Sequence, residues 1–128
     1  MDFSNTLMEA LEMKILVLEK DLVKIKMPVN EKTKQPMGFL HGGASVALAE
    51  TAASIGGMLN VEPHSQQIVG IEINCNHIKS KKDGFIIGKA TPIHKGKTTM
   101  VWEIKLTDED DDLIAISRCT IGIINKSH

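Results

Sequence analysis

The segment that most constrains the fold is a long run of alanine, glycine and other small residues in the first half of the chain. Residues 42–59 read GGASVALAETAASIGGML, and the high alanine content predicts one helix of about four to five turns. Gly56 and Gly57 are expected to weaken its C-terminal end, because glycine loses the most conformational freedom on folding. This helix carries little side-chain bulk, so any element that packs on it must approach closely.

The sequence on both sides of this helix is patterned mainly as β-strands. A short helix is expected at residues 4–11, then strands at 13–19 and 22–28, and a loop at 29–40. Four more strands are expected at residues 66–80, 84–93, 97–107 and 113–125. The joining segments are KKDG, HKGK and DEDDD, and KKDG in particular is typical of a hairpin. Consecutive hairpins predict an antiparallel sheet on which the helix buries its apolar surface, which is an α+β two-layer domain.

Period-two alternation also predicts the faces of two strands. In residues 22–28, Val23, Ile25 and Met27 alternate with Leu22, Lys24 and Lys26, so they are expected to share one face. The face predicted for the strand at 66–80 carries Val69, Ile71, Ile73, Cys75 and His77, with Glu72, Asn74 and Asn76 on the other side.

The composition fits a single domain over residues 1–128 and excludes several classes of function. Lys and Arg number 15 against 16 Asp and Glu, and aromatic residues make up 3% of the chain, which argues against a nucleic-acid partner. No apolar run approaches the roughly 18 residues needed to span a bilayer. The acidic N-terminus lacks the pattern of an export signal. A cytoplasmic protein without a membrane partner is therefore expected, with Cys75 and Cys119 as reduced structural thiols.

Glu50 is a lone carboxylate in the middle of the predicted helix, on a face of mostly small residues. Its neighbours three, four and seven positions away are Gly43, Val46, Ala47, Ala53, Ser54 and Gly57. Two interpretations fit this pattern. The helix packs closely on another element and Glu50 is paired or solvated, or a groove admits a thin ligand beside a reactive carboxylate.

The start of the helix is a second candidate site. Gly42 and Gly43 follow His41, and bare N–H groups at a helix N-terminus can form an oxyanion hole at the positive end of the helix dipole. A tight entry into the helix would require the same glycines. Taken singly, Gln35 fits a surface side chain, His41 a structural histidine, and Ser54 a hydroxyl bonded back to the carbonyl of residue 50.

Two segments carry a resemblance to a known family. Residues 35–54, QPMGFLHGGASVALAETAAS, closely resemble the signature of hotdog-fold acyl-CoA thioesterases, and residues 69–77, VGIEINCNH, resemble a second segment of that family. The nearest group is that of the 1,4-dihydroxy-2-naphthoyl-CoA thioesterases and their enterobactin-pathway proofreading relatives. The resemblance implies a hotdog fold, in which a curved antiparallel sheet wraps a long central helix. It further implies hydrolysis of an aromatic, hydroxyaroyl CoA thioester, such as the one in menaquinone synthesis, without a separate cofactor.

The resemblance also implies a role for each matched position. Glu50 corresponds to the catalytic carboxylate, which acts as nucleophile or as general base. Gln35 and His41 correspond to residues that position the thioester and the nucleophile. The N–H of Gly42 corresponds to the donor that polarises the thioester carbonyl, and Ser54 to a hydroxyl that orients water or Glu50. Contacts to coenzyme A are implied for His77, Lys79 and Ser80.

Basic residues occur in two clusters that could meet the phosphates of coenzyme A, although a solvated face is their usual role. The clusters are Lys79, Lys81 and Lys82, and His94, Lys95 and Lys97. Lys82 and His94 are therefore also expected to contact coenzyme A. Because the clusters flank the strand at 85–93, one protomer is not expected to join them, whereas a symmetric oligomer could. We expect a dimer or a dimer of dimers, and in the resembled family the site lies between two subunits. The five histidines show no metal-ligand spacing, so no metal is expected.

Other functions stay open on the sequence alone. A general medium- or long-chain acyl-CoA thioesterase is the main alternative, whereas the phenylacetyl-CoA branch typically has Asp at the position of Glu50. A non-catalytic acyl-CoA-binding regulator would need a DNA-binding helical extension, for which the short acidic N-terminus leaves no room. A hotdog dehydratase would need a different pattern of histidine and acid.

Overall fold

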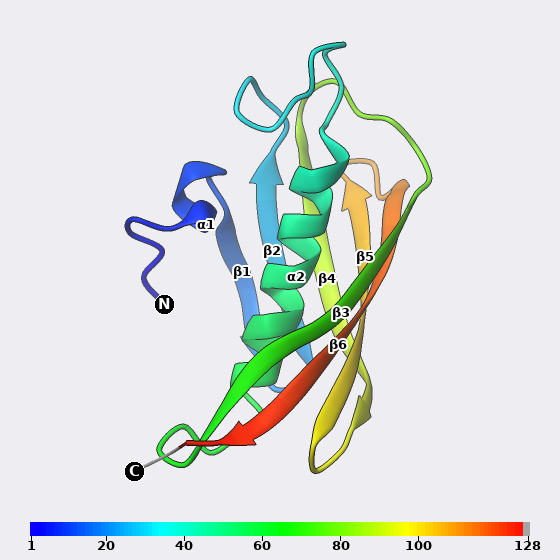
Figure 1. Cartoon of the computed structure of the whole chain (residues 1–128). Helices are drawn as coiled ribbons and strands as arrows, with labels where there is room; N and C mark the ends of the chain where they lie inside the picture. The colour runs from blue at the N-terminus through cyan, green and yellow to red at the C-terminus, as the bar shows by residue number, and fades with distance from the viewer. Residues whose placement is uncertain (127–128) are drawn as a thin grey trace.

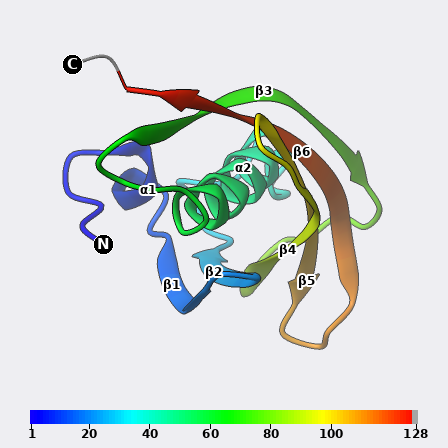
Figure 2. The same ribbon diagram turned by 90° about the horizontal axis from the view of Figure 1, so that it is seen from below.

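The computed structural model describes residues 1–126, and one six-stranded sheet dominates it. Its elements are α1 (Leu7–Ala10), β1 (Lys14–Glu19), β2 (Leu22–Pro28), α2 (Gly42–Met58), β3 (Gln66–His77), β4 (Phe85–Lys95), β5 (Thr99–Asp108) and β6 (Leu113–Asn125). The strands pair antiparallel in the order β1-β2-β4-β5-β6-β3. The sheet curls around α2, and β1 and β3 are its two free edges (Figure 1, Figure 2). The predicted α+β arrangement, a long helix wrapped by a curved antiparallel sheet, is confirmed.

The small residues of α2 allow the sheet to lie close to the helix. Leu48, Ala49, Ala52 and Ala53 have no exposed surface and form the centre of the core with side chains from the strands. The helix continues through both glycines near its C-terminal end. A Cβ at Gly56 would lie only 2.7 Å from a ring carbon of Trp102, so the absence of a side chain at this position leaves room for the buried indole.

The faces predicted for β2 are confirmed. Val23, Ile25 and Met27 are fully buried and alternate with half-buried residues along the strand. This is the pattern of a strand with one face on the core and one face outward.

The hairpin predicted at KKDG is wrong. β3 pairs with β6, whereas β4, the strand after KKDG, pairs with β2 and β5. Residues 78–84 instead form a long crossing connection, in which the N–H groups of Ile78 and Lys79 donate to the carbonyl of Ile114, and the N–H of Leu40 donates to the carbonyl of Lys81. A turn-forming tetrapeptide indicates where a strand ends but not which strand becomes its neighbour. The connections at HKGK and DEDDD do join paired strands, as predicted.

The face predicted for β3 is wrong in its first half because the strand contains a bulge. The register shifts between Gly70 and Glu72, so the alternation changes sides there. Ile73 and Cys75 share a face and pack against the core, but Val69 and Ile71, predicted to lie on that face, are 40% and 58% exposed. β3 therefore presents apolar side chains to the outside along a free edge of the sheet.

None of the helices in residues 1–126 has both the length and the apolar character needed to cross a membrane.

Candidate active site

The start of α2 is capped by His41, which lies just before the first helical residue. Its Nδ1 accepts a hydrogen bond of 2.8 Å from the N–H of Gly43, and its own N–H donates to the carbonyl of Thr33. His41 therefore has a structural role as the N-cap of α2. The cap uses the N–H of Gly43, and within residues 1–126 the N–H of Gly42 has no protein acceptor. Gly42 therefore supplies the free donor of the helix start.

A hollow of about 370 Å³ surrounds Gly42 and brings together half of the ten predicted site residues. We name it the helix-start hollow. It is lined by Gln35, Phe39, Leu40, Gly42, Ser45, His77, Ile78, Lys79, Ser80, Lys81 and Ile114. Four of these residues were linked to Gly42 in the sequence only through the family resemblance, and in the structure they lie beside it: Gln35, His77, Lys79 and Ser80. Ser45 was not predicted, although it follows His41 by one helical turn and is 98% buried on this side.

The contacts of Gln35 and His77 leave ligand-binding groups free in this hollow. The side-chain oxygen of Gln35 accepts the N–H of Met37 in a turn over residues 35–39, which leaves its amide NH₂ free to donate. The imidazole of His77 lies against Gly42, where an added Cβ would be 3.1 Å from both Cε1 and Nε2. A side chain at position 42 would thus intrude on the hollow and on His77.

Glu50 and Ser54 line a different hollow, of about 460 Å³, between α2 and the N-terminal segment. We name it the N-terminal hollow. Its lining is Met1, Asp2, Phe3, Thr6, Leu7, Met8, Ala47, Glu50, Thr51, Ser54, Ile55 and Met58. Two of the small residues expected beside Glu50 are elsewhere: Ala53 and Gly57 are buried against the sheet. The back-bond expected of Ser54 is likewise not seen within residues 1–126, where Thr51 makes such a bond to the carbonyl of Ala47 at 2.7 Å.

The Glu50 carboxylate reaches across to β3 and β6. A Cβ at Gly70 would lie 3.1 Å from its Oε2, so the glycine at the bulge of β3 leaves room for the carboxylate. Burial raises the pKa of the nearby Cys119 to about 11, and the charges of Glu50 and Glu72 add to this rise. Burial also raises the pKa of Cys75. Thiols with raised pKa values are poor nucleophiles at neutral pH, which supports the structural interpretation of both cysteines.

The two hollows are too far apart to serve one thioester within a single protomer. Gly42 and Glu50 are eight residues apart on α2, which corresponds to about 12 Å along a helix that rises 1.5 Å per residue. A reacting carbonyl must lie about 3 Å from both its donor and its nucleophile. One chain therefore holds two separate parts of the predicted catalytic set.

The basic residues expected to meet coenzyme A are partly neutralised by ion pairs. Lys79 binds Asp112 at 2.8 Å, Lys81 lies 3.6 Å from Asp108, and Lys95 binds Asp21 at 2.6 Å. Lys82 instead lies over the ring of Phe39, 5.2 Å from its centre. His94 is exposed near the far end of β4 from Lys82, as the sequence predicts, and does not line either hollow.

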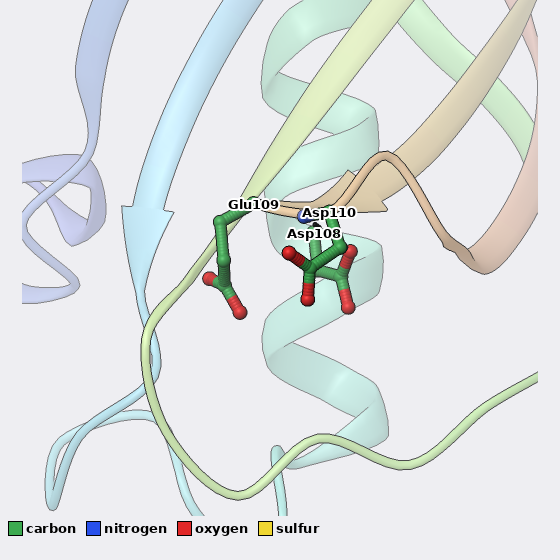
Figure 3. A group of neighbouring side chains, drawn as sticks. All are labelled: Asp108, Glu109 and Asp110. Atoms are coloured by element: carbon green, nitrogen blue, oxygen red, sulfur yellow. Dashed lines mark hydrogen bonds between the residues drawn. The ribbon is translucent and has the colours of Figure 1, made fainter.

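Three acidic side chains gather at the turn between β5 and β6, where the sequence predicts only a connection between strands. The carboxylates of Asp108, Glu109 and Asp110 lie within 4.8 Å of one another (Figure 3). Lys81 pairs with Asp108 and Glu109, and the N–H groups of Asp110 and Asp112 donate to Asp108 at 3.0 Å. Burial acts to raise the pKa of Asp108, but these hydrogen bonds and the charge of Lys81 lower it overall. Asp108 and Glu109 are thus bound by protein groups, and their pairs with Lys81 hold residues 78–84 to this turn.

Comparison with known proteins identifies the family. Residues 37–115, which include the start of α2, Glu50 and His77, match the thioesterase superfamily. The 1,4-dihydroxy-2-naphthoyl-CoA hydrolase of Listeria monocytogenes is 48% identical over 94% of this chain and 97% of its own length.

Solved structures agree with this match along nearly the whole chain. A thioesterase of Pseudomonas aeruginosa, with a glutamine replaced by alanine, is 34% identical over 95% of this chain and 88% of its own, with a TM-score of 0.93. A Staphylococcus aureus protein with a glutamate replaced by alanine is 46% identical over 94% of this chain and 99% of its own, with a TM-score of 0.91. A further structure of the S. aureus protein, described as a thioesterase, carries alanine in place of a glutamine. Together with the curled sheet and its central helix, these matches show that the chain belongs to the thioesterase superfamily and has its hotdog fold.

Proposed function

We propose that this protein hydrolyses an aromatic acyl-CoA thioester, with 1,4-dihydroxy-2-naphthoyl-CoA as the first candidate substrate. The observation that carries the proposal is the helix α2, which presents a free backbone donor at Gly42 and a carboxylate at Glu50. The name of the L. monocytogenes relative supports the choice of acyl group. Menaquinone synthesis as the pathway and a cytoplasmic location remain predictions.

The chemistry follows from the two groups on α2. The N–H of Gly42, with the amide of Gln35 beside it, would bind the thioester oxygen and stabilise the charge that develops there; one such donor is typically worth about 2.7–4 kcal/mol. Glu50 would attack the carbonyl carbon itself or remove a proton from an attacking water. If Glu50 attacks, the C–S bond breaks, coenzyme A leaves as a thiolate that takes up a proton, and water then hydrolyses the mixed anhydride to the carboxylic acid and free Glu50. If water attacks, the C–S bond breaks and the carboxylic acid forms directly. Ser54, one turn from Glu50, would orient the water or the carboxylate.

The site is proposed to form between two copies of the chain. The separation of about 12 Å between Gly42 and Glu50 supports a site that combines the helix-start hollow of one protomer with Glu50 and Ser54 of another. The free edge at β3, with Val69 and Ile71 exposed, offers a surface for a second copy. In the S. aureus protein the substituted glutamine and glutamate are separated by the same interval as Gln35 and Glu50, which supports assigning these two positions to the site. Dimer or dimer of dimers remains a prediction.

Replacing the carboxylate tests the proposal directly. Glu50→Ala should reduce turnover of the best acyl-CoA by more than tenfold, which is about 1.4 kcal/mol of transition-state stabilisation, with folding and CoA binding intact. Turnover is measured by release of free thiol, and Glu19→Ala, an exposed acid at the end of β1, is the matched control. Retention of more than a tenth of wild-type turnover would refute the role of Glu50. Binding of acyl-CoA by the wild type without any hydrolysis would instead favour the non-catalytic acyl-CoA-binding alternative.

Mixing two inactive variants tests whether the site is shared. Protomers with Gln35→Ala and protomers with Glu50→Ala, co-expressed in equal amounts, should form mixed dimers with one intact site, and the mixture should recover roughly a quarter of wild-type activity under random two-fold assembly. Recovery no greater than the sum of the two pure variants would contradict the shared site. The metal-free proposal is tested in the same assay, because EDTA should leave the rate unchanged.

A substrate panel decides the acyl group. We expect kcat/KM to be higher for 1,4-dihydroxy-2-naphthoyl-CoA or benzoyl-CoA than for acetyl-, hexanoyl- and palmitoyl-CoA. A tenfold or greater preference for a linear chain would favour the general acyl-CoA thioesterase instead.

A further inference from the structure

The N-terminal segment, residues 1–8, lies on the open side of the curled sheet, against the face of α2 that carries Glu50 (Figure 2). Four of its apolar side chains, Met1, Phe3, Leu7 and Met8, line the N-terminal hollow. Ala47, Ile55 and Met58 form the apolar part of the opposite wall on α2. The hollow is therefore a largely apolar space with the proposed nucleophile and Ser54 on one side.

The polar groups of this segment do not compete for the hollow, because they are bonded locally. Asp2 accepts hydrogen bonds from the N–H and the hydroxyl of Ser4, at 2.9 and 2.6 Å. The hydroxyl of Thr6 donates to the carbonyl of Phe3. An apolar group in the hollow would thus meet mainly carbon on the N-terminal side, and its polar contacts would come from α2.

The segment is attached to the rest of the protein by few contacts. None of the residues of α1 is buried, and Phe3, Met8 and Leu11 are the side chains that pack partly against the core. Leu7 is 58% exposed and Met58 is 49% exposed, although both line the hollow. Two large apolar side chains that face one hollow beside a carboxylate, without covering each other, leave apolar surface that a ligand can bury.

We propose that residues 1–8 form one wall of the acyl-binding site and that Leu7, opposite Met58, determines preference for a bulky apolar acyl group over a short one. The inference rests on the proposed acyl-CoA hydrolysis. Its physical basis is the volume of about 460 Å³ beside Glu50 and Ser54, which is far more than an acetyl group occupies. Contact with Leu7 and Met58 would strengthen binding of a ring or a long chain, because these groups bury more apolar surface than an acetyl group does.

The test compares two substrates in variants of the intact protein. Leu7→Ala and Met58→Ala should each lower the ratio of kcat/KM for benzoyl-CoA to kcat/KM for acetyl-CoA by roughly tenfold, the effect of trimming a hydrophobic pocket. Leu18→Ala is the matched control, because Leu18 is 43% exposed on β1 and lines neither hollow. Its ratio should stay within about twofold of the wild type.

The outcomes separate this inference from the proposed function. If Leu7→Ala leaves the ratio within about twofold, or lowers kcat/KM equally for both substrates, the N-terminal wall is refuted while hydrolysis stands. If the wild type releases thiol from no acyl-CoA, the proposed function fails and the inference with it. Because Leu7 is largely exposed, its truncation should not unfold the protein, and an unchanged thermal midpoint for both leucine variants verifies this.

Discussion

The two glycine pairs of α2 show how one residue type serves opposite purposes at the two ends of a helix. Gly42 and Gly43 lie at the start, where one N–H is held by His41 and the other is free in a hollow. Gly56 and Gly57 lie near the end, buried under Trp102 and Ile121. At the start, the missing side chains leave backbone available to a ligand; at the end, they let the core approach the helix axis. Substitutions at the two pairs should therefore separate activity from stability.

The largest effect is expected at the functional end. Gly42→Ala places a methyl group 3.1 Å from two ring atoms of His77, beside the N–H proposed to bind the thioester oxygen. We expect kcat to fall about a hundredfold, roughly 2.7 kcal/mol, with the free energy of unfolding nearly unchanged. Thiol-release kinetics and urea unfolding measure the two quantities. If Gly42→Ala lowered the rate and the free energy of unfolding together, the two glycine pairs would not differ in function.

The next effect is expected at the structural end. Gly56→Ala puts a methyl group 2.7–2.9 Å from three carbons of the Trp102 ring, and overpacking of this kind typically costs about 1–3 kcal/mol. We expect a loss of about 2 kcal/mol in the free energy of unfolding, measured by urea denaturation. Gly57→Ala is the matched control, because its nearest contact is the flexible end of Ile121 at 3.2 Å, and it should change stability little. Equal losses for the two variants would show that contact with Trp102 does not decide the cost.

A smaller effect is expected from the cap that separates the two N–H groups at the helix start. His41→Ala removes the acceptor of the Gly43 N–H, and loss of an N-cap typically costs about 1 kcal/mol. His41→Asn supplies another capping side chain and should restore most of the stability. If both variants lose activity but only His41→Ala loses stability, His41 contributes to the reaction as well as to the cap. Full activity of His41→Asn would limit His41 to the cap.

The last effect is absent near neutral pH and appears only at alkaline pH; it concerns the region between the two pairs, where Glu50 lies near Cys119. Burial raises the pKa of Cys119 from 9.0 to about 11, with the charge of Glu50 as a further cause. The folded state therefore holds this proton more tightly than the unfolded state, so the resulting stability is complete below pH 9 and is lost as pH rises through about 11. The free energy of unfolding should decline over this window, and Cys119→Ala should show a shallower decline. Identical slopes would show that Cys119 does not carry the effect.

The sequence predicted the elements well because their signals are local. Alanine content identified α2, and alternation of apolar residues identified β2 and its buried face. It failed where the outcome depends on distant partners: the strand after KKDG pairs with β2 and β5, and one extra residue at Gly70–Glu72 reverses the outward face of β3. Gln35, His77 and Ser80 were predicted only from the family resemblance, because they come close to Gly42 only in the folded structure. Nothing local could indicate that Phe3 and Leu7 would lie beside Glu50, or that Lys79 and Lys81 would pair with the DEDDD turn.

The strand order has a consequence for how the chain matures during synthesis. β3 leaves the ribosome before β4 and β5, but its only strand neighbour within residues 1–126 is β6, which ends at Asn125. A nascent chain halted near residue 112 would hold α2 and five strands with β3 unpaired on both edges, which invites proteolysis and aggregation. Closing this long-range pairing is also a slow kind of step in folding. Synthesis of β6, Leu113–Asn125, therefore completes the sheet, because β3, whose Gly70 lies beside the Glu50 carboxylate, gains its strand neighbour only then.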